Sequence, residues 1–282
     1  MRALILAGGA ARNSYQLGCL QYLLGNLQIQ YDLIIGVSSG AILGSFLGQY
    51  KSGQEKQSID DLSILWKGIK TKDICKPWRP LGRIHALWKH GLYDNSNIFA
   101  LVRNNIKLEK IRSSDKTVCV SVVEMSDGLH HTINQDDENF LTYVVASAAF
   151  PGVFPAVQIN DRFYIDGGTK DLVNTQYAID RGCSQIDILL TTPNKIEKEA
   201  FSPSILNIIR RIVDIQSDKI MTSDLDRILN YNEMPGRDKI LLNIIRPNDT
   251  LLANSFKWEA DKMEELIFMG YSDAIQQYHN HE

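Results

Sequence analysis

Cysteine is scarce in this chain of 282 residues, and none of its four cysteines forms a C-x-x-C pair. The spacing therefore lacks the signature of a zinc site or of a disulfide framework, and it suits a reducing compartment. We expect Cys19 and Cys119, which lie in apolar periodic runs, to be free buried thiols.

An excess of charge of one sign is also lacking, because the net charge is −3 at pH 7. Without a basic field, nucleic acid is not an expected partner. The longest apolar run, residues 33–47, is interrupted by glycines and serines, so we do not interpret it as a membrane span. The N-terminus begins with a strand and has no signal-peptide pattern, which favours a cytoplasmic location. No polar gap is longer than a loop, so residues 1–282 are expected to form one domain.

Strands and helices alternate at the start of the chain. Apolar strands are expected over 2–7 and 31–37, and helices over 14–27 and 39–50. Near-continuous apolar strands are typical of a parallel sheet covered on both faces, which predicts a three-layer α/β/α fold with a mostly parallel central sheet. Asn13 or Ser14 is expected to cap the first helix, and Ser58 the third. Further helices are expected over 58–69, 95–111, 140–150, 202–231 and 258–279, and further strands over 117–124, 129–134, 163–165, 186–190 and 239–245.

The stretch from Gly36 to Gly40 fits the pattern G-x-S-x-G, with Ser38 at its centre, between a predicted strand and a predicted helix. This is the pattern of a nucleophile elbow. Glycine is expected on both sides of Ser38 because a Cβ atom there would collide with the neighbouring backbone. The N-terminus of the following helix would help to stabilise an oxyanion formed at Ser38. The alternative is an ordinary glycine-serine turn.

A serine nucleophile needs a base, and the histidines of this chain are poorly placed for that role. They are His85, His90, His130, His131, His279 and His281. Asp166 is a better candidate, because it ends a short apolar strand and is followed by Gly167 and Gly168. These glycines would let another backbone approach closely, and a partly desolvated carboxylate can accept a serine proton. The alternative is an aspartate-glycine turn.

A glycine-rich turn follows the first strand and has three interpretations. It does not fit the dinucleotide pattern G-x-G-x-x-G, because Ala10 and Asn13 stand where later glycines would be. As an oxyanion hole it fits better, since such a turn directs its N–H groups inward. The third interpretation is a mere tight turn. The backbone of the oxyanion turn would be that of Gly8, Gly9, Ala10 and Ala11. Arg12 would either bind a phosphate or brace the turn.

Three segments together resemble the patatin-like phospholipase family, in particular its bacterial-type, single-domain members. They are the opening turn and helix 6–18, the segment 146–155 before Asp166, and the closing helix around 269–274. The resemblance implies a Ser–Asp dyad of Ser38 and Asp166, an oxyanion turn around Gly9 to Ala11, and lipid acyl hydrolase activity. The chain departs from the family pattern in two places. Ala10 and Asn13 replace two glycines of the turn, and Gln176 replaces the family's usual proline after Asn174.

Residues 68–95 interleave basic residues with aromatic ones, including Trp78 and Trp88. Such a segment can serve as a lid or face a membrane surface. We favour the other interpretation, an insertion whose tryptophans pack on the core while its charges are solvated.

The sequence thus predicts a serine acyl hydrolase (a phospholipase A, lipase or esterase) that cleaves lipid carboxylic esters through an acyl-enzyme intermediate. No metal and no cofactor are expected. The protein would be cytoplasmic, and it would contact a membrane surface transiently if residues 68–95 face one. One alternative is a catalytically impaired module that binds lipid or protein, and another is a hydrolase of small esters or thioesters.

Overall fold

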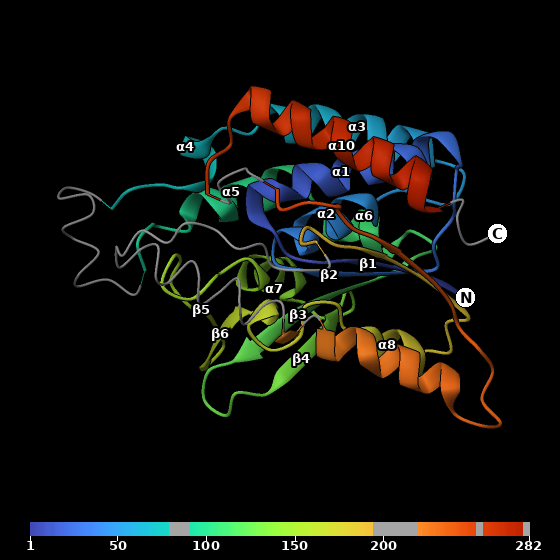
Figure 1. The fold of residues 1–282 in the computed structure, drawn as a ribbon. Helices are drawn as coiled ribbons and strands as arrows, with labels where there is room; N and C mark the ends of the chain where they lie inside the picture. Colours follow the sequence, from blue (N-terminus) through green and yellow to red (C-terminus); the bar gives the residue numbers. More distant parts are fainter. Residues whose placement is uncertain (79–90, 194–218, 221, 252–255, 279–282) are drawn as a thin grey trace.

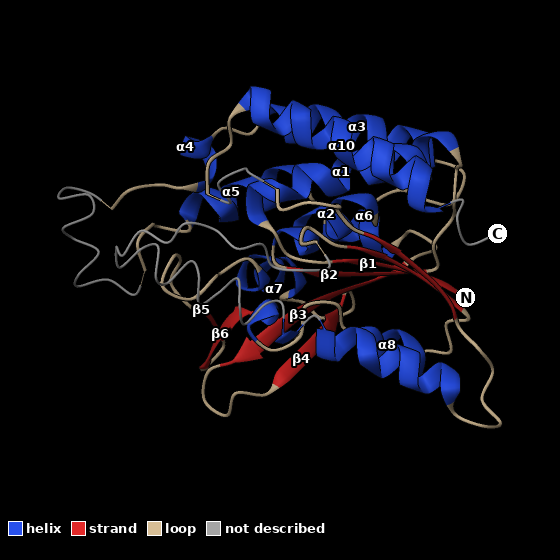
Figure 2. Ribbon diagram, in the orientation of Figure 1, coloured by secondary structure: helices blue, strands red, loops and turns tan. Residues whose placement is uncertain are grey.

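The computed structural model of the chain describes residues 1–78, 91–193, 219–220, 222–251 and 256–278. Its centre is a mixed eight-stranded sheet with helices on both faces (Figures 1 and 2). The strands are β1 (Arg2–Leu6), β2 (Leu33–Val37), β3 (Thr117–Glu124), β4 (His130–Asn134), β5 (Val157–Ile159), β6 (Arg162–Asp166), β7 (Gln185–Leu189) and β8 (Leu241–Ile245). The described helices include α1 (Ser14–Leu20), α2 (Ser39–Leu47), α3 (Glu55–Gly68), α4 (Thr71–Ile74), α5 (Ser96–Asn105), α6 (Leu108–Arg112), α7 (Phe140–Ser147), α8 (Thr175–Asp180) and α10 (Ala260–Tyr278).

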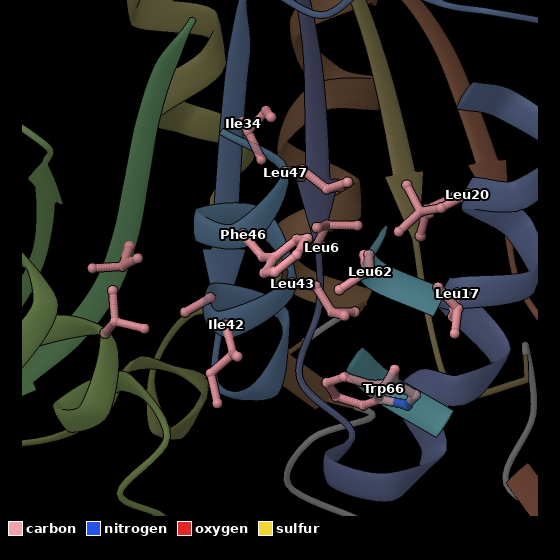
Figure 3. Close-up of a cluster of buried hydrophobic side chains, with 14 of the residues drawn as sticks. Leu6, Leu17, Leu20, Ile34, Ile42, Leu43, Phe46, Leu47, Leu62 and Trp66 are labelled. Carbon is pink, nitrogen blue, oxygen red and sulfur yellow. The ribbon is translucent and has the colours of Figure 1, made fainter. Parts of the chain in front are cut away.

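The middle of the sheet is parallel, in the order β3-β2-β1-β7-β8. Residues of β1 alternate between two cores: Leu4 and Leu6 pack toward α1, α2 and α3, whereas Ala3 and Ile5 pack on the opposite face. Figure 3 shows the first of these cores, with Leu6 beside side chains from α2 and α3. Burial on both faces explains why these strands are apolar throughout, and the predicted three-layer α/β/α fold is confirmed.

Strands β2 and β6 lie along the same edge of β3, one after the other. β2 pairs with β3 up to the Val37–Ser121 pair, and β6 pairs with it from the Val122–Asp166 pair onward. β4 pairs with β3 over residues 119–123, which overlaps both ranges, so it must occupy the other edge. Because β2 and β6 run in opposite directions, their carboxyl ends meet at the middle of β3.

Helix boundaries differ from the predictions in several places. The helix expected over 95–111 is two helices, α5 and α6, and the one expected over 140–150 is α7, which ends earlier, at Ser147. Ser58 does not cap α3; its hydroxyl lies inside the helix and donates to the Glu55 carbonyl at 2.7 Å. Residues 222–233 are helical, while 194–218 of the helix predicted over 202–231 lie outside the described residues.

Two further differences concern shorter segments. The first helix continues from α1 into a π-helical segment, Gln21–Asn26, and so covers nearly all of the predicted range 14–27. The strand expected over 163–165 belongs to a β5–β6 hairpin, closed by Asn160 and Asp161. Asn160 there has a φ of 53°, which asparagine tolerates better than most residues.

Candidate active site

Ser38 occupies the turn between β2 and α2 in a strained conformation. Its φ is 58° and its ψ is −129°, a combination that costs energy for any residue with a side chain. Its N–H group donates to the Oγ atom of the fully buried Ser147, at 3.0 Å. The side chain of Ser38 is half-buried. A sharp strand-to-helix turn with the serine at its tip is the geometry of a nucleophile elbow.

The glycines on either side of Ser38 are required by space, as predicted. A Cβ atom on Gly36 would lie 2.4 Å from the Ala41 Cα atom, and one on Gly40 would lie 2.2 Å from the Leu6 carbonyl oxygen. Real Cβ atoms do not approach other atoms this closely. The two glycines therefore allow α2 to start directly against β1 and β2.

The glycine-rich turn lies against Ser38. A Cβ atom added to Gly8 would be 2.8 Å from the Ser38 Cβ atom. Ala10 adopts a φ of 52°, in the left-handed region that a third glycine would occupy more easily. The N–H groups of Gly9 and Ala10 both donate to Ser39 Oγ, at 3.2 and 2.7 Å. These two amides therefore point at one oxygen atom, Ser39 Oγ, and the donors of an oxyanion hole point at one oxygen in the same way.

The remaining residues of this turn, Ala11, Arg12 and Asn13, pack or hydrogen-bond within the protein. Ala11 is buried, and Arg12 is half-buried, with its N–H donating to the Gly9 carbonyl at 3.0 Å. Asn13 occupies the N-cap position of α1 as predicted, but its side chain makes no capping hydrogen bond, and the Ser14 hydroxyl donates to the Ala11 carbonyl at 2.9 Å instead. The φ of Asn13, −66°, also shows that the positive φ of the turn falls on Ala10 rather than on Asn13.

Three buried polar side chains, those of Asn13, Gln16 and Thr191, hold the glycine-rich turn through hydrogen bonds to backbone carbonyls. The Asn13 amide group donates to the Ala7 carbonyl at 3.1 Å, and that of Gln16 donates to the Ala7 and Leu189 carbonyls at 2.9 and 2.8 Å. Thr191 donates to the Gly8 carbonyl at 2.8 Å. Sequence reasoning missed Gln16 and Thr191; a polar residue between Tyr15 and Leu17 in a predicted apolar helix was the available signal for Gln16.

Asp166 ends β6 at the point where β2 and β6 meet, so it lies beside the elbow. Its side chain is 1% exposed, and Oδ1 accepts the Gly168 N–H group at 2.8 Å. Oδ2 makes no hydrogen bond that satisfies normal geometry within the described part of the chain. Burial raises the pKa of Asp166 to about 7, although the neighbouring Ser38 hydroxyl and the Gly168 N–H group act in the opposite direction. A carboxyl group of this kind can exchange a proton near neutral pH.

Gly167 allows the close approach that the sequence predicted. A Cβ atom on this residue would lie 2.4 Å from the Ser121 carbonyl oxygen of β3. One on Gly168 would lie 3.1 Å from Asp166 Oδ1, so a side chain there would crowd the carboxyl group. Further along the same loop, the Asn174 amide group donates to the hydroxyls of Ser121 and Thr132, at 3.0 and 2.7 Å. This loop is thus tied to β3 and β4 without the proline that Gln176 replaces.

The described histidines, His130 and His131, lie on β4, on the far edge of β3 from the elbow. His131 Nε2 is 3.6 Å from Glu124 Oε2, and burial lowers the pKa of His130. Within the described ranges, Glu124, Asp127 and His131 form the one acidic-histidine group compact enough for a metal. The Arg162 guanidinium already lies 2.8 Å from the same Glu124 oxygen, where it would oppose a second cation.

The segment predicted as a lid or membrane-facing insertion is described only in part. Trp78 is half-buried, and its indole N–H donates to the Gly91 carbonyl at 2.9 Å. Trp88 lies outside the described residues. Of the helices that the structure describes, none has both the length and the hydropathy needed to cross a membrane.

A strained serine at a strand–turn–helix junction, beside a buried carboxyl group on a mostly parallel sheet, defines a class of α/β proteins with a nucleophile elbow. A family profile described as patatin-like phospholipase matches residues 4–179, which is more than half of the chain. The chain therefore belongs to the patatin-like phospholipase family, as its motifs predicted.

One curated relative is named "Probable lipid hydrolase 463L", from Invertebrate iridescent virus 6. It is 26% identical over 183 residues, a match that spans 59% of this chain and 59% of the viral protein. Two solved structures are similar to 99% of the chain: VipD from Legionella pneumophila (13% identity, TM-score 0.49, 67% of that chain) and the type III effector protein ExoU (11% identity, TM-score 0.36, 53% of that chain).

Proposed function

We propose that the chain is a serine acyl hydrolase that cleaves carboxylic esters of lipids, with Ser38 as nucleophile and Asp166 as base. The observation that carries the proposal is the strained Ser38 next to a buried carboxyl group with a pKa of about 7. Membership of the patatin-like phospholipase family and the name of the viral relative support a lipid substrate.

In the first half of the reaction, Ser38 Oγ attacks the ester carbonyl carbon while Asp166 accepts the hydroxyl proton. The carbonyl oxygen becomes negatively charged and is stabilised by N–H groups of the glycine-rich turn, in this proposal those of Gly9 and Ala10. When the intermediate collapses, the bond to the alcohol breaks, and Asp166 returns the proton to the leaving oxygen. Water then attacks the acyl-enzyme with Asp166 again as base, which releases the fatty acid and restores Ser38.

The proposal is tested with the purified chain on p-nitrophenyl esters of increasing acyl length and on a phospholipid. We expect hydrolysis that improves with acyl length and is abolished by Ser38→Ala and by Asp166→Ala. Ser113→Ala, on an exposed helix end, is the matched control and should keep wild-type activity. Activity that survives Ser38→Ala would contradict the mechanism, and a preference for short acyl chains would favour the small-ester alternative.

A second candidate function is a non-catalytic lipid-binding or protein-binding module. It is favoured by one observation: the two amides proposed for the oxyanion already donate to Ser39 Oγ. A fluorophosphonate probe separates the two functions, because an idle serine would not react with it. We expect covalent labelling of the wild type and none of Ser38→Ala.

Contact with a lipid surface through residues 68–95 is a separate part of the proposal. Its test is co-sedimentation with phosphatidylcholine vesicles, in which Trp78→Ala and Trp88→Ala should weaken binding. Unchanged binding in both variants would assign the tryptophans to packing alone.

A further inference from the structure

Ser39 links the two turns of the site directly. It is the first residue of α2, it is 7% exposed, and its Oγ atom accepts the N–H groups of Gly9 and Ala10. One of its neighbours is the strained Ser38, and one of its partners is the left-handed Ala10. The G-x-S-x-G pattern leaves this position unspecified, so the sequence alone assigns it no role.

The position of Ser39 Oγ is informative because two backbone donors point at it. Donors at 2.7 and 3.2 Å from one oxygen are close to the arrangement in which an oxyanion hole holds a charged oxygen. Here the oxygen is that of a neutral hydroxyl. The two amides therefore have an acceptor before any substrate arrives, and they avoid the cost of burial without a partner.

A neutral hydroxyl is also an acceptor that can be replaced. Hydrogen bonds to a charged oxygen are roughly twice as strong as those to a neutral one. The uncharged carbonyl of a bound ester would gain little by displacing Ser39 Oγ, whereas the oxyanion of the transition state would gain much more. Donors held in this way favour the transition state over the ground state, and only that difference accelerates the reaction.

We propose that Ser39 is a positioning residue that holds the amides of Gly9 and Ala10 ready for the oxyanion. The inference rests on the proposed function, since it presupposes hydrolysis through Ser38. Ser39 compensates for Ala10 in this role: alanine in the left-handed region relaxes more readily than glycine, and the hydrogen bond to Ser39 opposes that relaxation.

The test compares Ser39→Ala, Ser39→Thr and Ser45→Ala in p-nitrophenyl ester hydrolysis. Ser45 is the matched control, because it lies on the same helix, is fully buried, and its Oγ has no hydrogen bond within the described residues. Active sites are counted with a fluorophosphonate probe, so that kcat refers to correctly folded enzyme. Thermal unfolding is recorded for every variant.

We expect Ser39→Ala to lower kcat per labelled site by about tenfold to hundredfold, which is less than the loss of an oxyanion donor, while KM stays within about threefold. Ser39→Thr keeps the acceptor oxygen and should restore kcat to within about threefold. Ser45→Ala should resemble the wild type. A purely structural role would lower the unfolding temperature and the labelled fraction but leave kcat per labelled site unchanged.

Three results would overturn the inference. The first is an unchanged kcat per labelled site in Ser39→Ala. The second is an increased kcat, because Ser39 would then block the amides. The third is a Ser39→Thr variant as slow as Ser39→Ala despite native stability. If the wild type neither hydrolyses esters nor reacts with the probe, the proposed function fails and the inference fails with it. If the wild type is active and Ser38→Ala is inactive, the proposed function stands, and the Ser39 variants then test the inference alone.

Discussion

The burial of Asp166 makes the stability of the protein depend on pH in a definite direction. Its pKa is 3.8 when exposed and about 7 in the folded protein. Between these values the folded protein retains a proton that the unfolded chain has lost, so the free energy of unfolding falls as the pH rises. Above pH 7 the folded carboxyl group is ionised and the destabilisation is complete. A difference of about 3 between the two pKa values corresponds to about 4 kcal/mol.

Asp166→Asn removes this titration and keeps the size of the side chain. We expect the free energy of unfolding of the variant, relative to the wild type, to rise by roughly 3 to 4 kcal/mol from pH 4 to pH 8. Urea unfolding at both pH values measures it. Asp161→Asn is the control, since this neighbouring side chain is exposed. A stability difference between Asp166→Asn and the wild type that is equal at pH 4 and pH 8 would refute the argument from burial.

The same carboxyl group sets the expected pH dependence of activity. As the proposed base, Asp166 must be ionised, so kcat/KM should rise with pH and reach half of its maximum near pH 7. Asp166→Asn should be inactive throughout and yet more stable at alkaline pH. A gain in stability with a loss of function is expected where a site holds an unfavourable charge.

Two other substitutions test the packing around the site, both by urea unfolding at pH 7. Ser147→Ala removes the acceptor of the Ser38 N–H group and should cost about 1 to 3 kcal/mol and lower kcat. The exposed control Ser113→Ala should change stability by about a few tenths of a kcal/mol. Gly270→Ala places a Cβ atom 1.9 Å from a carbonyl oxygen of α1, and separating α1 from α10 should cost about 1 to 3 kcal/mol. Gly68→Ala, with open space around it, should be neutral or slightly stabilising. Equal effects within either pair would contradict the packing explanation.

The positions of Ser38 and Asp166 at the ends of their strands could be predicted because each has a local signal. Glycines on both sides of Ser38 mark the tight turn, and the apolar residues before Asp166 mark the end of a strand. Their meeting could not be predicted in this way. It requires β2 and β6 to pair with the same edge of β3 in opposite directions, and pairing between strands that are distant in the sequence leaves no local pattern.

The polar residues that support the site were missed for a related reason. Ser147 and Gln16 lie in helices whose apolar residues dominate the pattern, and Ser39 occupies the unspecified position of G-x-S-x-G. All three are buried and hydrogen-bonded to the backbone of a turn. Periodicity assigns polar residues to the solvent-exposed face of a helix. It therefore does not identify a buried polar residue that hydrogen-bonds to a loop.

The two glycines that Ala10 and Asn13 replace in the proposed oxyanion turn have different structural consequences. Asn13 has an ordinary right-handed conformation, and its amide group anchors the turn to the end of β1. Only Ala10 takes the left-handed conformation, at a cost of about 1 to 2 kcal/mol relative to glycine. The two replacements thus differ in kind: Asn13 adds a buried hydrogen bond, whereas Ala10 adds strain at the amide nearest Ser39. Any weakness of the proposed oxyanion hole therefore depends on Ala10, and the hydrogen bond between its N–H group and Ser39 Oγ is the interaction that opposes this weakness.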